Sequence, residues 1–198
     1  MHSRQTLCTL TAALFLVPAP SGAQALVGRS DSIYTWRGAV PAGALLSIRN
    51  FNGPIEVRSA DGASAELRAE KRASRGSGSI EDVAFVVEKG SGGDVSICAS
   101  MRNTSSCGER GDGYDGDDRG GWRRNVTVAM TVRLPRGARL KVATGNGIVT
   151  VQGVGGDVQA STGNGAVRID DTEGAVRVST GNGDVDVRGA RSAVRVTS

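Results

Sequence analysis

The sequence predicts an all-β protein, specifically a β-solenoid (single-stranded β-helix) in which nine residues form each half-turn and 18 form one coil. Three observations predict it. The tetrapeptide Thr-Gly-Asn-Gly occurs at 144–147, 162–165 and 180–183, a constant spacing of 18 residues. Each 18-residue unit divides into two nonapeptides, and apolar residues alternate with other residues after each turn. A fixed period of this kind is typical of repeat architectures.

The nonapeptides from Thr144 to Thr197 define the strands and the turns. Every unit has Val at its sixth position and a small or β-branched aliphatic residue at its eighth, with mostly polar residues or Ala between them. This period-two alternation is the pattern of a strand with one buried face. Glycine predominates where the chain must turn tightly. We expect these turn residues to be architectural: Gly145, Asn146, Gly147, Gly163, Asn164, Gly165, Gly181, Asn182 and Gly183.

Two architectures fit the repeat. In an antiparallel β-meander of hairpins, each Asn-Gly forms a type I′ turn, and the valine face of the single sheet needs a separate cover. In a solenoid, two sheets turn their valine faces toward each other. The solenoid also places equivalent turns above one another, so that amide and hydroxyl ladders run through Asn146, Asn164 and Asn182 and through Thr144, Thr162 and Thr180. We favour the solenoid.

The N-terminal half contains a weaker copy of the same pattern. Residues 41–57 match residues 135–151 at a constant offset of 94, each with a Pro-x-Gly entry, a strand, an Asn-Gly turn and a second strand. We therefore expect the chain to begin a coil stack twice. We also predict strands at 65–69, 83–87, 95–99 and 126–134, and an exposed loop rich in Gly, Asp and Arg at 99–124.

The predicted organisation is a leader followed by one body. Residues 1–25 read as a secretory signal peptide, with Arg4, an apolar segment at 7–17 and an Ala-x-Ala cleavage site ending at Ala25. Residues 26–134 form the irregular β half, and residues 135–198 form the regular nonapeptide half. No later segment is long and apolar enough to predict a transmembrane span. We expect an exported protein that is periplasmic, on the cell surface or extracellular.

Two cysteines remain after the leader, Cys98 and Cys107. An even pair nine residues apart in an exported chain indicates a local disulfide. A reactive thiol is the alternative, but neither a CxxC spacing nor a histidine partner supports it.

Composition argues against most catalytic and metal chemistry. The only histidine, His2, lies in the predicted leader, so we predict no catalytic residues, no metal site and no cofactor. Calcium-binding β-rolls also use nonapeptides, but with Asp at the sixth position where this chain has Val. The net charge of +4 is too small to indicate a nucleic-acid partner. The 4% aromatic content agrees with thin, valine-lined coils.

The sequence offers two candidate binding surfaces. In the solenoid, Arg177 and Arg195 stack on one outer face and form a basic column that can meet an anionic glycan or a phosphate-rich polymer. Trp36 and, in the long loop, Tyr114 and Trp122 can stack on sugars, although covering exposed coil ends is the favoured role. Either surface would take an envelope polysaccharide or another envelope protein as its partner.

The Pro-x-Gly-x-x-Leu-x-Val entry at 135–142, the repeated Gly-Asn-Gly-x-Val-x-Val and the leader together resemble the bacterial DUF4097 family of adhesin-like β-strand repeat proteins. More distantly, the chain is similar to the head-GIN auto-transporter adhesin domains. The resemblance covers roughly residues 33–198. It implies an exported, solenoid-like envelope protein and supplies no catalytic residues. The pattern stops at 196–198 without an atypical capping unit, so we expect either a longer chain or a partner that caps the last coil.

We therefore predict a non-enzymatic exported envelope protein that presents a β-solenoid surface for adhesion or for envelope and glycan interaction. Two alternatives stay open: a carbohydrate-active enzyme of the β-helix type, and an envelope-stress accessory protein that binds a membrane regulator.

Overall fold

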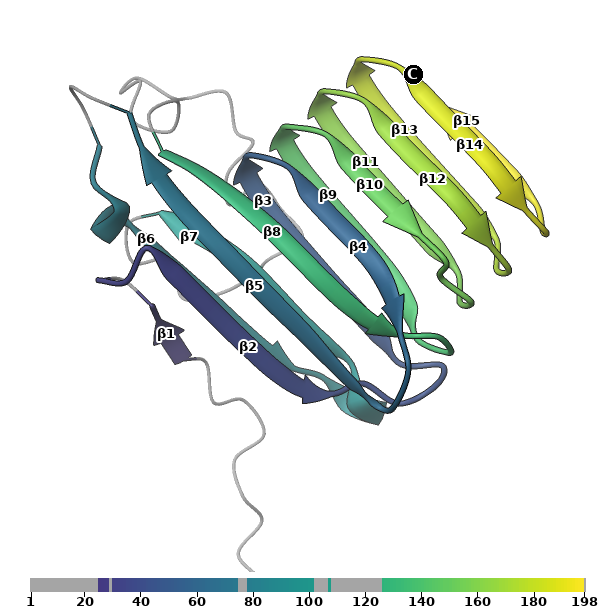
Figure 1. Ribbon diagram of the computed structural model, residues 1–198, viewed down its shortest axis with the longest axis horizontal. Helices are drawn as coiled ribbons and strands as arrows, with labels where there is room; N and C mark the ends of the chain where they lie inside the picture. Colours follow the sequence, from purple (N-terminus) through teal and green to yellow (C-terminus); the bar gives the residue numbers. More distant parts are fainter. Residues whose placement is uncertain (1–24, 29, 75–77, 102–106, 108–125, 198) are drawn as a thin grey trace, which may run out of the picture.

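The computed structural model describes residues 25–28, 30–74, 78–101, 107 and 126–197. The chain forms two sheets of mostly parallel strands that share one core (Figure 1). The predicted all-β solenoid is confirmed, and the meander is not formed. Within the described ranges, the helical segments are two short 3₁₀ turns, η1 (Ile80–Asp82) and η2 (Ser91–Gly93), and no helix is long and apolar enough to cross a membrane.

The strands alternate between the two sheets along the coil stack. In spatial order, the eight-stranded sheet contains β1 (Ala25–Val27), β6 (Val83–Lys89), β7 (Val95–Met101), β3 (Leu45–Asn52), β9 (Arg139–Asn146), β11 (Val158–Asn164), β13 (Val176–Asn182) and β15 (Val194–Thr197). The seven-stranded sheet contains β14 (Val185–Ala190), β12 (Val167–Thr172), β10 (Val149–Gln152), β4 (Ile55–Ala60), β8 (Val126–Pro135), β5 (Ser64–Ala73) and β2 (Ile33–Ala39).

The regular half of the chain is a parallel stack with an exact 18-residue step. β9, β11, β13 and β15 pair in parallel in one sheet, as do β10, β12 and β14 in the other. Val158 pairs with Val176, and Val149 pairs with Val167. Each coil therefore contributes one strand to each sheet, as the nonapeptide division predicts.

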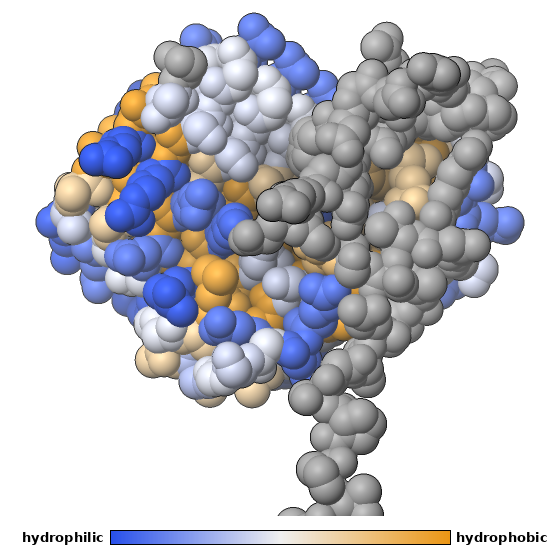
Figure 2. All heavy atoms as spheres, turned by 180° about the vertical axis from the view of Figure 1, so that it is seen from behind, coloured by the Kyte–Doolittle hydropathy of each residue, from blue (hydrophilic) through white to orange (hydrophobic). Residues whose placement is uncertain are grey.

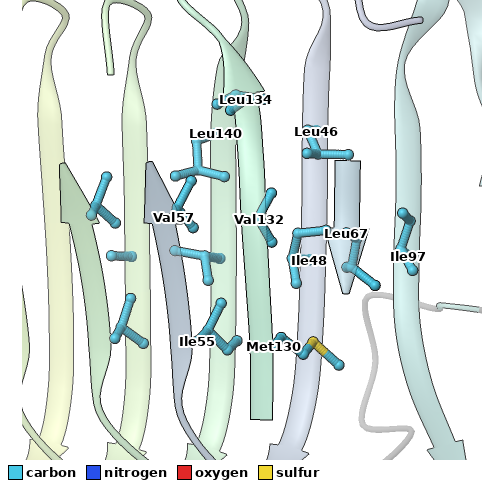
Figure 3. Packing of buried hydrophobic residues seen from close by; sticks show 14 of the residues in the cluster. Leu46, Ile48, Ile55, Val57, Leu67, Ile97, Met130, Val132, Leu134 and Leu140 are labelled. Atoms are coloured by element: carbon cyan, nitrogen blue, oxygen red, sulfur yellow. The ribbon is translucent and has the colours of Figure 1, made fainter. Parts of the chain in front are cut away.

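The valine stripe forms the core between the sheets. The sixth-position residues Val149, Val158 and Val167 are at most 1% exposed, and the eighth-position residues of the same coils are equally buried. Figure 3 shows aliphatic side chains of both sheets pointing into this shared interior. Burying one such side chain contributes about 1.5–3 kcal/mol, so the stripe alone is a large stabilising term.

The two copies separated by 94 residues are neighbouring coils of one stack. Leu46 pairs with Leu140 and Ile48 with Val142 in one sheet, and Ile55 pairs with Val149 in the other. The expectation that the chain begins a stack twice is therefore wrong. The chain makes one coil with β3 and β4, leaves the stack, and resumes beside that coil with β9 and β10.

β1 and β2, which precede the first coil, and β5 to β8, which lie in the excursion between the coils, form a second kind of strand order that we call the lobe. In the seven-stranded sheet, β8 pairs in parallel with β4, and β5 then pairs antiparallel with both β8 and β2. In the other sheet, β7 pairs in parallel with β3, and β6 lies antiparallel between β7 and β1. The rings of Tyr34 and Phe85 stack across the lobe with their centroids 4.3 Å apart.

Each turn of the stack lies in main-chain contact with the next. The Gly147 N–H donates to the Asn164 carbonyl at 2.9 Å, and the Gly165 N–H donates to the Asn182 carbonyl at 2.8 Å. Gly165 has a φ of +147°, and an added Cβ would collide with the Gly147 carbonyl oxygen. Glycine is therefore required by the backbone conformation and by the close approach of the coils.

The predicted asparagine ladder forms, whereas the hydroxyl ladder does not. Asn164 Nδ2 donates to Asn146 Oδ1 at 2.9 Å, and Asn182 Nδ2 donates to Asn164 Oδ1 at 3.0 Å. The buried Thr162 hydroxyl instead donates to the Gly147 carbonyl of the previous coil at 3.0 Å, and Thr144 and Thr180 bond in the same way. Each threonine thus satisfies a turn carbonyl rather than another threonine.

A buried lysine ties the lobe together. Lys71, 2% exposed, points inward from β5, and its Nζ donates to the carbonyl oxygens of Gly28, Ile80 and Val83 at 2.6, 3.0 and 3.2 Å. Burial lowers the pKa of Lys71, because desolvation disfavours its charged form. These bonds join the segment after β1, the η1 turn and the start of β6.

We predict that Gly165→Ala lowers the free energy of unfolding by about 2–5 kcal/mol, because backbone strain and a main-chain collision add together. Gly43→Ala is the matched control: Gly43 also has a positive φ, +80°, but an added Cβ there meets nothing within 4 Å. The control should cost about 1–2 kcal/mol. Urea unfolding followed by circular dichroism measures both, and equal losses would show that coil contact is not the constraint.

Candidate functional site

The outer face of the seven-stranded sheet has two halves with different charge. Over the coils, outward side chains of β12 and β14 pair with opposite charges: Arg168 lies opposite Asp186, and Asp170 lies opposite Arg188. Arg188 also forms a 2.7 Å ion pair with Asp186 on its own strand. This half is therefore neutral overall and forms a solvated surface.

The other half, over the lobe, is hollowed. A depression of about 610 Å³ lies across β2, β5 and β8. We call it the arginine groove. Alternate residues of a strand point to opposite faces, so the outward side chains of the groove come from alternate positions of the three strands. Trp36 and Leu67, at the positions between them, also line the hollow. The lining residues are Thr35, Trp36, Arg37, Glu66, Leu67, Arg68, Thr131 and Arg133.

Strand register arranges the groove in two rows. Glu66 on the central strand β5 pairs with Arg37 on one side and with Arg133 on the other. In the second row, Arg68 on β5 is likewise the partner of Thr35 and of Thr131. Since β2 and β8 both run antiparallel to β5, each presents a Thr-x-Arg pair in the same direction. The groove therefore contains one arrangement twice.

The groove has an excess of positive charge. Arg37 forms a 3.4 Å ion pair with Glu66, and Arg68 forms a 3.4 Å pair with Glu70. Arg72 and then Arg68 hold the pKa of Glu70 below its usual range, so this carboxyl stays ionised. The exposed Arg133 has no ion pair with any residue in the described ranges. Among the described residues it is the one arginine of the groove lining without an ion pair, although Glu66 is its register partner on β5.

These groups suit binding better than catalysis. A guanidinium offers a planar set of donors that matches a carboxylate or phosphate in two-point contact, and neighbouring threonine hydroxyls add neutral hydrogen bonds. Glycoside hydrolysis requires two carboxyl groups facing each other across the substrate. The groove lining contains one carboxylate, Glu66, which Arg37 contacts. Within the described ranges, no group of three metal-ligating side chains lies together.

The predicted basic column lies on the other side of the molecule. Arg177 and Arg195 are register partners on β13 and β15, and both are exposed on the outer face of the eight-stranded sheet. Figure 2 views the molecule from the side opposite to that of Figure 1 and shows hydrophilic residues scattered among apolar ones. The column and the groove therefore lie on different sheets. Tyr114, Trp122 and residues 1–24 of the predicted leader lie outside the described residues. The predicted loop is wrong at 99–101, which belong to β7, and apart from Cys107 the rest of it is not described.

Sequence analysis named Trp36 as a candidate for stacking on sugars and missed the other groove residues. The signal that could have found them is the repeated Thr-x-Arg in two segments of period-two alternation, at 35–37 and 131–133. Their proximity was not accessible, because 94 residues separate Arg37 from Thr131 and only the pairing of each strand with β5 joins them.

The structure joins Cys98 and Cys107 in a disulfide with a Cα–Cα distance of 5.7 Å. Both cysteines pack with Val86 in a small cluster separate from the main core. The Cys107 N–H donates to Glu88 Oε1 at 3.0 Å, and Arg49 Nη1 donates to the Cys107 carbonyl at 3.1 Å. The bridge and these two bonds fix Cys107 against β7, β6 and β3.

Comparisons with known proteins leave the function open. No protein-family model matches the chain, so the resemblance to DUF4097 stays a prediction. No curated protein matches it either. Among solved structures, a "putative cell adhesion protein" from Clostridium sporogenes is similar over 83% of this chain and 98% of its own, with 8% sequence identity and a TM-score of 0.39. Similarity at this level assigns no function.

We predict that Cys98→Ala combined with Cys107→Ala lowers the free energy of unfolding by about 2–3 kcal/mol, the loop-closure value for a short disulfide loop. Urea unfolding of the variant and of the unreduced protein measures the difference. Mass spectrometry without reductant supplies the control, because two free thiols in the unreduced protein would contradict the bridge itself.

Proposed function

We propose that this chain is a non-enzymatic, exported bacterial envelope protein that serves adhesion or envelope interaction by holding an anionic envelope polymer in the arginine groove. The observation that carries the proposal is the arginine groove itself. Three arginines on neighbouring strands line a hollow on an otherwise charge-balanced sheet, and Arg133 forms no ion pair within the described residues. An anionic ligand would supply that missing charge.

The shape of the site supports a polymer rather than a small molecule. The groove lies open on the sheet surface and crosses three strands, so a chain can enter and leave along it. Its side chains project from paired strands, whose backbone positions are set by the hydrogen-bonded ladder. A rigid surface of this kind loses little conformational entropy when it binds.

The enzyme alternative gains no support from the groove, where a second carboxylate is missing from the lining. The alternative of an accessory protein that binds a membrane regulator has no specific observation in its favour. The Arg177 and Arg195 column is a second surface that the same experiment can test, because it lies on the opposite sheet.

We predict that Arg133→Gln weakens retention on an immobilised acidic polysaccharide by about tenfold or more, the effect of losing one charge-assisted contact. Arg188→Gln is the matched control, since Arg188 lies on the same sheet but in its neutral half, and it should change retention less than twofold. Arg177→Gln combined with Arg195→Gln tests the other face. Loss of retention only in that double variant would show that the groove is not the site.

A further inference from the structure

The groove repeats one pair of functional groups at a fixed distance. Thr35 and Arg37 on β2 correspond to Thr131 and Arg133 on β8, and the two strands lie on either side of β5. Neighbouring strands are about 4.8 Å apart, so equivalent atoms of the two pairs are separated by about 9.6 Å. The direction from one pair to the other runs across the strands, along the axis of the stack.

Each pair suits a sugar that carries a carboxylate. The guanidinium can bind the carboxylate in two-point contact, while the threonine hydroxyl, two residues away on the same face, reaches a hydroxyl of the same ring. Both threonines are exposed, so their hydroxyls are accessible to a ligand. A uronic acid provides both groups on one rigid ring.

The residue between the two pairs adds selectivity. Glu66 lies in the same row as Arg37 and Arg133, midway between them. A ligand carboxylate held at each arginine gains charge pairing, whereas a carboxylate placed between them meets the negative Glu66. The row therefore favours a chain that carries acid groups two sugars apart with a neutral sugar between them.

We propose that the arginine groove binds a linear acidic polysaccharide with a carboxylate on every second sugar, and that the two Thr-x-Arg pairs are successive subsites for its uronic acids. This inference rests on the proposed function and specifies its ligand. The polymer lies across β8, β5 and β2. Arg37 and Arg133 hold the carboxylates, and Glu66 disfavours polymers that are acidic at every sugar.

The test uses size-defined oligosaccharides and calorimetry on the full chain. Hyaluronan tetrasaccharide has two carboxylates two sugars apart, whereas hyaluronan disaccharide has one and digalacturonate has two on adjacent sugars. We expect the tetrasaccharide to bind at least tenfold more tightly than either. Arg37→Gln and Arg133→Gln should each remove that advantage, with Arg188→Gln as the unchanged control and circular dichroism to verify folding.

A further variant separates selection from simple charge attraction. Glu66→Gln should raise the affinity for trigalacturonate several-fold more than the affinity for the hyaluronan tetrasaccharide, because the middle carboxylate no longer meets a negative charge. Equal binding of digalacturonate and tetrasaccharide, or a loss with only one of the two arginine variants, overturns the paired subsites but leaves the anionic groove. Binding of poly(glycerol phosphate), a polymer without uronate, would likewise overturn the paired subsites and leave the anionic groove. If no anionic polymer binds, the proposed function itself fails.

Discussion

The close main-chain contact between equivalent turns is the constraint on which the structure depends. At Gly165, the turn carbonyl of the previous coil occupies the space that any side chain would need. The same contact carries the hydrogen bond from the Gly147 N–H to the Asn164 carbonyl. A coil that was one residue longer or shorter would lose both. The 18-residue step is therefore enforced at every turn, and the asparagine ladder and the valine stripe follow from it.

A fixed step also determines the outer surface. Because the register of each parallel strand is set by the turns, outward residues that are 18 apart in sequence lie side by side in space. Charge along the coils can then be balanced strand by strand, as Arg168 and Asp186 show. The lobe escapes this rule, because its strands, β1 and β2 before the first coil and β5 to β8 after it, are not repeated. A different pattern, with uncompensated charge and a hollow, can be held there on the same sheet.

The sequence predicts the repeating part of this fold well and the lobe only in outline. The 18-residue period determines the coil, the two sheets and the asparagine ladder, and the 94-residue offset matches the observed register of Leu46 with Leu140. The lobe strands β6 and β8 are predicted as strands at 83–87 and 126–134, but their partners are not, since long-range antiparallel pairing leaves no period in the sequence. Lys71 illustrates the limit: nothing in the sequence pattern marks it as buried, and only the folded lobe gives it three carbonyl acceptors.

Two basic surfaces remain, and physical arguments favour the groove over the column. Arg177 and Arg195 protrude from an exposed sheet face at the end of the stack, where water and salt screen an approaching anion. In the groove, β2 and β8 flank β5 in the same sheet, and a polymer lying across the hollow would contact side chains of all three strands. An ion pair at 4 Å is worth about 1 kcal/mol in water but several-fold more at the lower effective dielectric near a protein surface. The groove lining contains three arginines and the column two. The duplicated Thr-x-Arg pairs of the proposed site also add a spacing that the column, with adjacent like charges, does not provide.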